Sequence, residues 1–416
     1  MEFIFIKNTN ISNISKLDNI SNMTNITNIN IEKNINLTKI INQNKAGIFD
    51  IKINKTTKIK KIGVISADHN QNIGNNLFRK KLEAWKLPKN NGSFQASNFL
   101  RNNNLLKYAM FIKLKEFGFE PEIIGYLRPR NNISFLNKTI NIRCIEKSFR
   151  EIKRDDYDIL MVNSDQTWRN WHNNTPSEDP FFYDVAFLRF SQNWNLPKFV
   201  YSASLGVNYW KFNKEDDNIA KYLLKNFSEI SVREKGSIEL IQKHLGYKAE
   251  FVLDPTLLIN KQYYLDLIKN YKDEIIVNNN YIVVYILNDS IFFKNYIDKI
   301  NNYKKYLITF PFENGIKKFI YGISNCKGVI TDSYHGTLFS IIFNKPFISF
   351  VLDDNGDERF NSLKEVFNLT ERIFELESNP DIKLLEKPLK INQTILNSLK
   401  MKSINFLKRN LKNTII

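Results

Sequence analysis

The stretch Val329-Ile330-Thr331-Asp332-Ser333-Tyr334-His335-Gly336-Thr337 joins a short apolar run to a polar turn and then to the start of a second apolar run. Residues 337–343 place apolar side chains at helical spacing, so we expect a strand near 328–331, a turn and then a helix. In open parallel sheets, ligands bind beyond the carboxyl ends of strands and at the N-termini of the helices that follow. The stretch therefore predicts an α/β fold and a functional site near His335.

Apolar runs of strand length alternate with helical stretches along most of the chain. The strand-like runs are 62–65, 123–126, 157–162, 199–203 and 229–232, and the alternation restarts after residues 254–256 at 281–287, 306–309 and 347–351. This spacing predicts parallel sheets with crossover helices. We expect an Asn/Ile/Lys-rich segment at 1–58, an N-terminal module at 59–255 with an insertion at 78–104, a second module at 256–384 and a basic amphipathic helix at 385–416.

Length and composition narrow the class of protein. A chain of 416 residues with 43% hydrophobic residues fits two globular domains with cores. We expect no spanning helix and no secretory signal, because no run of about eighteen apolar residues and no basic, then apolar leader is present. Cys144 and Cys326 are too few for a disulfide framework, which favours a reducing cytosol. The formal charge of +17 accompanies a general over-use of Lys, Asn and Ile, so we expect it to serve anionic substrates or a membrane surface rather than nucleic acid.

Two polar loops of the N-terminal module are candidates for sugar binding. Asp165, Gln166 and Trp168 follow an apolar strand, and a carboxylate, an amide and an indole together suit a sugar ring and its hydroxyls. The alternative is that Asp165 caps a helix and Trp168 lies in the core. Asn72 and Gly74 follow the first strand, where Gly74 allows close approach of the backbone to a ligand, and a plain turn is the alternative.

Two further strand ends are candidates for anion binding. Arg233 can bind a carboxylate or phosphate bidentately, or it can pair with a carboxylate of the protein. His335 precedes the apolar helix, where backbone donors and the helix dipole favour an anion, and its pKa suits proton transfer near neutrality. No spacing of His with carboxylates predicts a metal site.

Taken in order, these segments resemble the polysaccharide pyruvyl transferase family over about residues 60–375. The motifs that carry the resemblance are Asn72-Ile73-Gly74, Ser164-Asp165-Gln166-Thr167-Trp168, Ser231-Val232-Arg233-Glu234, Leu253-Asp254-Pro255-Thr256 and Thr331–Thr337. Asn163 stands where the family usually has Gly. With Tyr201-Ser202-Ala203-Ser204-Leu205-Gly206 these are six motifs in the family's order, and they are specific together although none is decisive alone.

The resemblance implies a GT-B-like pair of Rossmann-type parallel-sheet domains with a cleft between them and no separate cofactor. It implies transfer of a pyruvyl group from phosphoenolpyruvate to a sugar of a cell-surface polysaccharide or of its precursor. From the cysteine count and the basic C-terminal helix, we expect the protein in the cytoplasm, at the inner face of the membrane, where a lipid-linked saccharide acceptor would be within reach. The donor would be bound by residues near two strand ends: Arg233, His335, Gly336, Thr337 and Arg359. The acceptor would be bound by Asn72, Gly74, Asp165, Gln166 and Trp168. His335 would be the acid or a phosphate clamp, and Asp165 or Asp332 the base.

Two departures from the family pattern leave alternatives open. Ser333 stands where some branches have Arg, so a second cation has to come from Arg359 or Lys345. The alternatives are a GT-B glycosyltransferase that uses a nucleotide-sugar, or a catalytically inactive family member that acts as a binding subunit. For the active enzyme, we expect Arg233→Ala and His335→Ala to abolish transfer while the melting temperature changes by only a few degrees. The C-terminal helix either packs on the N-terminal module or docks on anionic lipid.

Overall fold

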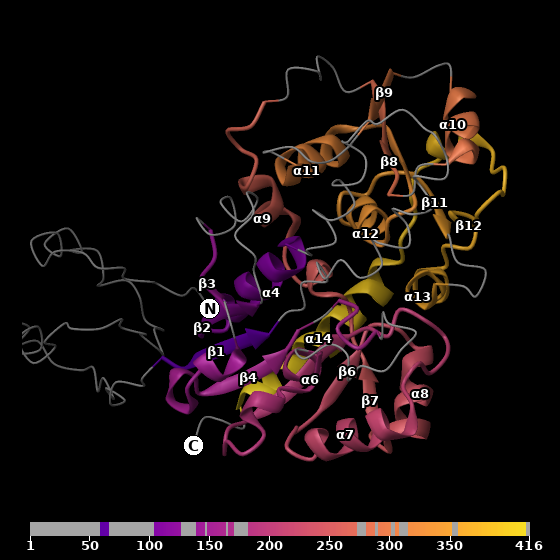
Figure 1. Ribbon diagram of the computed structural model, residues 1–416. Coiled ribbons are helices and arrows are strands. Elements are labelled where there is room, and N and C mark those ends of the chain that lie inside the picture. The colour runs from indigo at the N-terminus through magenta and orange to yellow at the C-terminus, as the bar shows by residue number, and fades with distance from the viewer. Residues whose placement is uncertain are drawn as a thin grey trace, which may run out of the picture. The chain divides into compact units, whose positions relative to one another are not determined.

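The computed structural model describes residues 59–65, 104–125, 139–145, 148–163, 165–169, 182–272, 280–287, 290–300, 304–307, 315–351 and 357–412 (Figure 1). The predicted segment 1–58, the loop with Asn72 and Gly74, and the insertion up to residue 103 lie outside these ranges. The span Lys60–Ile416 is one compact unit, and its described residues include two sheets. The division into two domains after residue 255 stays a prediction.

The first sheet has seven strands in the order β3-β2-β1-β4-β5-β6-β7, and every neighbouring pair is parallel. Its strands are β1 (Lys61–Ile65), β2 (Glu120–Gly125), β3 (Ile142–Cys144), β4 (Ile159–Val162), β5 (Lys198–Ala203), β6 (Ile230–Val232) and β7 (Ala249–Phe251). The connecting helices are α4 (Asn104–Glu116), α6 (Phe182–Phe187), α7 (Lys214–Leu224) and α8 (Gly236–Leu245). The central strands β4 and β5 are buried along their whole length, which is expected of parallel strands covered on both faces.

The second sheet has five parallel strands in the order β12-β11-β10-β8-β9. Its strands are β8 (Tyr281–Tyr285), β9 (Lys304–Leu307), β10 (Gly328–Thr331), β11 (Phe347–Val351) and β12 (Ile373–Glu375). The helices of this half are α9 (Lys261–Asp266), α10 (Ile291–Asp298), α11 (Gly315–Asn325), α12 (Tyr334–Ile342) and α13 (Glu358–Phe367). Two successive parallel sheets with crossover helices confirm the predicted fold class.

The C-terminal helix α14 (Gln393–Lys412) packs on the first sheet, although it follows the second sheet in the chain (Figure 1). The ring of Phe406 lies 6.4 Å from that of Phe199 and 6.1 Å from that of Tyr201, both on β5. Ser403 Oγ accepts a hydrogen bond from the backbone N–H of Leu253 at 2.9 Å. These contacts confirm the packing alternative for the helix.

Leu396, Phe406 and Leu407 belong to the buried apolar face of α14, whereas 44% of Ile395 is exposed. Arg409 of α14 forms ion pairs with Glu229 at 2.6 Å and with Glu250 at 2.7 Å. Among the helices of the described ranges, none combines the length and apolar character that crossing a membrane requires.

Candidate functional site

Charged and polar side chains gather where strands of both sheets end. We call this group the polar cluster: it consists of Asp165 after β4, Arg233 and Glu234 after β6, Asp254 after β7, Tyr334 and His335 at the start of α12, and Asp357 and Arg359 at the start of α13. The cluster lies where ligands bind in parallel α/β proteins. It joins the two sheets, because contacts cross from Arg233 to Tyr334 and from Asp254 to His335.

Arg233 is at the centre of the polar cluster, and its side chain is only 1% exposed. Its Nη2 donates to Asp165 Oδ1 at 2.8 Å, and its Nη1 donates to Asp254 Oδ2 at 2.8 Å. Burial by itself would lower the pKa of Arg233, but Asp165, Tyr334 and Asp254 together raise it above its ordinary value. Of the two alternatives for this residue, the structure therefore shows the pairing with protein carboxylates.

Asp254 is a member of the polar cluster that sequence reasoning missed. Its carboxylate is fully buried and accepts hydrogen bonds from the backbone N–H and the hydroxyl of Thr256, at 2.9 and 2.7 Å. Asp254 Oδ2 also lies 3.9 Å from His335 Nε2. The only signal in the sequence was its place in the motif Leu253-Asp254-Pro255-Thr256, which carried the family resemblance without a role in the site.

His335 has one ring nitrogen without a protein hydrogen-bond partner among the described residues. Although 15% of the side chain is exposed, the Nε2 atom itself is buried and unpaired. Burial lowers the pKa of His335 below its ordinary value; nearby Asp254 opposes this shift and Arg233 adds to it. The imidazole is therefore mostly neutral at pH 7. Buried polar atoms normally have partners, so this nitrogen is suited to meet a ligand.

Tyr334 carries two guanidinium groups against its ring. The guanidinium carbon of Arg233 lies 4.7 Å from the ring centroid, and that of Arg359 lies 5.4 Å from it. Such contacts stabilise the cations through the ring quadrupole. Burial raises the pKa of the Tyr334 phenol, although Arg233 lowers it, so the phenol stays neutral.

Arg359 is the more accessible of the two cations, since 18% of its side chain is exposed. Its Nε donates to Asp357 Oδ1 at 2.8 Å, and Asp357 also caps α13 by accepting from the backbone N–H of Arg359. Burial opposes the charge, but Asp357 raises the pKa of Arg359 above its usual value. The predicted second cation therefore lies in the cluster.

Glu234 was also missed, although it directly follows Arg233. Burial raises the pKa of this carboxyl, against the opposing effect of Arg233. Its carboxylate accepts from the backbone N–H of Leu205 at 3.2 Å and from the hydroxyl of Ser237 at 3.1 Å. Glu234 therefore ties the loop after β5 to the start of α8.

The loop after β4 contains a strained residue and two buried amides. Asp165 has a φ of 84°, which a residue with a side chain adopts uncommonly. Asn163 is fully buried, and neither polar atom of its amide has a protein partner among the described residues. The same holds for Nε2 of Gln166, which lies so close to Gly206 that a Cβ there would be 2.3 Å from it. An unsatisfied buried polar group costs about 1–3 kcal/mol, so these amides are suited to bind a polar ligand.

Trp168 lies in the hydrophobic core, which corrects its assignment to the acceptor site. Its ring stacks on Phe187 with centroids 5.2 Å apart, and its Nε1 donates to the backbone oxygen of Ala186 at 2.8 Å. The indole is buried, so its faces are covered by protein. The signal in the sequence could not distinguish a stacking platform from a core residue.

Backbone N–H groups at the start of α12 donate hydrogen bonds to Ser333 in the turn that precedes the helix. Gly336 N–H donates to Ser333 Oγ at 3.3 Å, and Thr337 N–H donates to the Ser333 backbone oxygen at 3.0 Å. Packing favours a glycine at position 336, since a Cβ there would lie 2.4 Å from Thr331 Oγ1. Asp332 accepts from the backbone N–H of Leu287 at 2.6 Å, which links the ends of β8 and β10. We expected Gly336 and Thr337 to bind the phosphoenolpyruvate donor, but in this structure their backbone N–H groups already donate to Ser333 in the cap of α12.

Within the described ranges, no group of three or more His, Cys, Asp or Glu side chains is placed to hold a metal ion. The chemistry of the polar cluster is instead that of two guanidiniums, an unpaired imidazole nitrogen and fixed carboxylates. Such a set can bind an anion and move a proton.

The fold and the polar cluster define an α/β protein with a candidate ligand site at the carboxyl ends of its strands. The family described as polysaccharide pyruvyl transferase matches residues 103–354, which is more than half of the 416-residue chain. The chain belongs to this family and is a transferase. Among curated proteins, none matches it.

Several solved structures are similar to this chain over most of its length at low sequence identity. A putative UDP-N-acetylglucosamine 2-epimerase from Listeria monocytogenes is 10% identical, with 86% of this chain and 97% of that chain covered and a TM-score of 0.47. MnaA from S. aureus, solved with UDP, is 11% identical, with 85% and 97% covered and a TM-score of 0.46. A glycosyltransferase from Rickettsia africae is 11% identical, with 86% and 98% covered and a TM-score of 0.39.

Proposed function

We propose that the protein transfers a pyruvyl group from phosphoenolpyruvate to two hydroxyls of a sugar in a cell-surface polysaccharide or its precursor, and so forms a cyclic ketal. The observation that carries this proposal, together with the family, is the buried and unpaired Nε2 of His335 beside two guanidiniums. Phosphoenolpyruvate brings a carboxylate and a phosphate of about −1.5 to −2, which need cations and donors of this kind.

The donor's anionic groups contact the accessible members of the polar cluster. His335 and Arg359 are partly exposed, whereas Arg233 is buried and has both η nitrogens occupied by carboxylates. Arg233 can contact the donor only if one of its ion pairs opens. We therefore assign donor binding first to His335 and Arg359, and to Arg233 the positioning of Asp165 and Asp254.

The proposed chemistry balances without a further reactant. The anionic donor raises the pKa of His335, whose imidazolium then delivers a proton to the methylene carbon of the enol. A sugar hydroxyl attacks the resulting cationic carbon and gives up its proton to Asp165. The bond to phosphate breaks, phosphate leaves with the electron pair, and a second hydroxyl closes the ketal. The two sugar hydroxyls release two protons. One restores the proton that His335 gave to the methylene carbon, and the other leaves with phosphate.

The acceptor is a saccharide bound from the side of the first sheet. The unpaired amides of Asn163 and Gln166 can donate to and accept from its hydroxyls. We also propose that the enzyme acts in the cytoplasm and meets a lipid-linked acceptor at the inner face of the membrane. Lys402, Lys408 and Lys412 of α14 are exposed, and each contributes on the order of 1 kcal/mol near anionic lipid.

The test combines donor binding with turnover. Phosphoenolpyruvate should raise the melting temperature, because a ligand that binds only the folded state stabilises it. Phosphate release should require both donor and glycan acceptor. His335→Gln and Arg359→Gln should each lower turnover at least about 100-fold. Lys364→Gln, on the same helix as Arg359 and paired with Glu375, should not.

Other outcomes would contradict the proposal in distinct ways. Stabilisation by a nucleotide-sugar but not by phosphoenolpyruvate would indicate a glycosyltransferase. Binding of phosphoenolpyruvate with no turnover on any acceptor would favour an inactive binding subunit. Full-length protein that never sediments with anionic vesicles would refute the membrane contact alone.

A further inference from the structure

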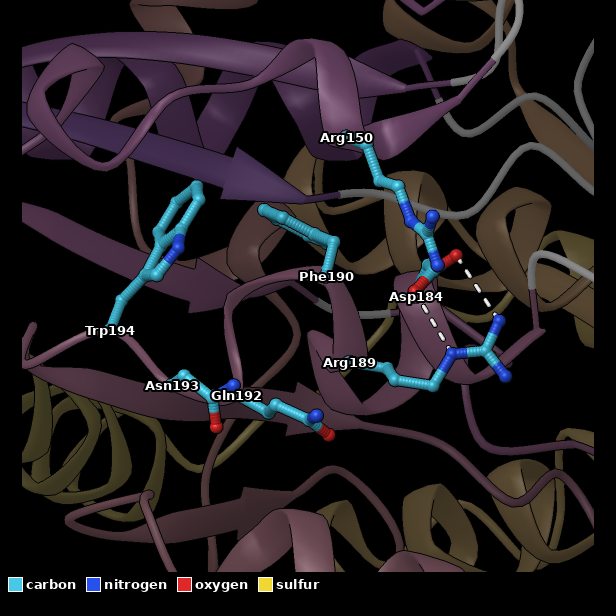
Figure 2. A pocket seen from close by; sticks show the side chains of 7 residues that line it. All are labelled: Arg150, Asp184, Arg189, Phe190, Gln192, Asn193 and Trp194. Carbon is cyan, nitrogen blue, oxygen red and sulfur yellow. Dashed lines mark hydrogen bonds and ion pairs between the residues drawn. The ribbon is translucent and has the colours of Figure 1, made fainter.

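A hollow of about 270 Å³ lies on the first-sheet half of the chain and shares no residue with the polar cluster (Figure 2). It is bordered by the short 3₁₀ helices Phe149–Glu151 and Arg189–Ser191 and by the loop that leads to β5. The side chains that the argument uses are Arg150, Arg189, Phe190, Gln192, Asn193 and Trp194. None of them has a role in the function proposed above.

The backbone of the loop that lines the hollow is held in place from outside the loop. Four of its carbonyl oxygens accept hydrogen bonds from side chains of other segments. Lys198 Nζ donates to Ser191 at 2.6 Å and to Trp194 at 3.2 Å, Asn226 Nδ2 donates to Gln192 at 2.7 Å, and Arg154 Nη2 donates to Asn195 at 2.9 Å. A fixed backbone presents its side chains in one arrangement, which lowers the entropy lost when a ligand binds.

The side chains presented by this loop are those that recognise sugars. Trp194 and Phe190 meet edge to face with centroids 5.6 Å apart, and both are only partly buried. Phe190 is itself fixed, because it stacks on buried Phe149 at 5.4 Å. The neighbouring amides of Gln192 and Asn193 supply donors and acceptors for hydroxyls. An aromatic wall with amides beside it is typical of a carbohydrate site.

The charges at the hollow select for an anionic group. Arg189 pairs with Asp184, with Nε 3.2 Å and Nη2 3.4 Å from the carboxylate oxygens. The guanidinium of Arg150 points toward this pair in Figure 2 and makes no ion pair among the described residues. Among the side chains that line the hollow, the guanidiniums of Arg150 and Arg189 accompany one carboxylate, that of Asp184, and a guanidinium binds carboxylate or phosphate bidentately.

We propose that this hollow is a binding subsite for an acidic saccharide, which holds a charged sugar unit of the polysaccharide away from the polar cluster. This inference rests on the proposed function for the identity of the polymer, but not for binding itself. A pyruvyl ketal keeps its carboxylate, so a unit modified in an earlier turnover has the same chemistry as a uronic acid unit.

Binding is measured by calorimetry on the full chain without phosphoenolpyruvate. The probes are a hexasaccharide of alternating glucuronate and N-acetylglucosamine, a neutral N-acetylglucosamine hexasaccharide, and inorganic phosphate. We expect the acidic hexasaccharide to bind at least tenfold more tightly than the neutral one. Arg150→Gln should remove most of this preference, and Trp194→Ala should weaken both hexasaccharides. Lys221→Gln, a partly exposed lysine on α7, is the matched control and should bind like wild type.

Three results would overturn the inference. They are equal affinity for the neutral and acidic hexasaccharides, unchanged affinity in Arg150→Gln, or binding of phosphate alone with no saccharide. Circular dichroism of each variant checks that the fold is retained, and Trp194→Phe keeps the test valid if the alanine variant does not fold. His335→Gln should bind the acidic hexasaccharide like wild type. Loss of transfer in His335→Gln is expected from the proposed function. If the wild type binds the acidic hexasaccharide but shows no transfer, that result counts against the proposed function and not against the subsite.

Discussion

Replacing Arg233 by Met should destabilise the protein much more than a surface residue would. The substitution removes a guanidinium that is 1% exposed and breaks its ion pairs with Asp165 and Asp254, both at 2.8 Å. Breaking a buried ion pair by removing one partner costs about 3–5 kcal/mol, because the remaining charge stays buried and unpaired. The buried ion pairs therefore lead us to expect a larger loss of stability than the change of only a few degrees that we expected from the sequence for Arg233→Ala.

The expected shift follows from the size of the folded unit. Unfolding entropy is about 2.1 cal/mol/K per residue, or roughly 0.7 kcal/mol/K for the unit Lys60–Ile416. A loss of about 3–5 kcal/mol therefore lowers the melting temperature by about 4–7 °C. The assay is thermal unfolding followed by circular dichroism at neutral pH.

Arg143 offers a matched control, since it pairs with Asp156 at 2.7 Å with both side chains about one-third exposed. Arg143→Met should cost about 1 kcal/mol or less, because solvent screens the pair. In an Asp165→Asn background, Arg233→Met should cost less than in the wild type, since one of the two ion pairs that the substitution breaks is already absent. A melting temperature within about 1 °C of wild type for Arg233→Met would refute the reasoning.

Three further predictions concern the other parts of the fold. His335→Gln should gain stability relative to wild type as pH falls from 7 to 5.5: the pKa of folded His335 is lowered, so the unfolded chain takes up its proton first and only the wild type loses stability below about pH 6.5. Urea unfolding at both pH values measures this, and a difference that does not change with pH contradicts it. Gly336→Ala should lower the free energy of unfolding by about 1–3 kcal/mol, because the new Cβ meets Thr331 at 2.4 Å, and unchanged stability by urea unfolding would show that the turn can adjust. Truncation after Lys390 removes α14 and should abolish soluble expression, whereas a stable truncated enzyme that no longer sediments with anionic vesicles would favour the membrane function of the helix.

The fold could be predicted because its signal is local. The helical stretches expected between the strand-like runs include Gly236–Leu245 and Gly315–Asn325, whose apolar residues recur at helical spacing. The helix expected from Thr337 begins three residues earlier, at Tyr334, because Ser333 caps it. Such a cap satisfies donors that periodicity alone does not reveal.

The candidate site could be predicted only in part, because its contacts join distant segments. Sequence patterns indicated His335, Asp165 and Arg233 as separate strand-end residues. They could not indicate that both η nitrogens of Arg233 are bound by carboxylates, since Asp165 lies 68 positions away in the sequence and Asp254 lies 21 positions away. Trp168 shows the same limit, because its partner for stacking, Phe187, belongs to another element.

The position of α14 sets the order in which the protein can fold during synthesis. Phe406 covers Phe199 and Tyr201, which leave the ribosome about 200 residues earlier. At about 5–20 residues per second, this face of β5 stays uncovered for on the order of 10–40 s. The first sheet can pair its strands in that interval, but its apolar face is open to aggregation or to chaperones. Slow or interrupted synthesis of the C-terminal residues should therefore cause more aggregation of the first sheet than of the second sheet, which directly precedes α14.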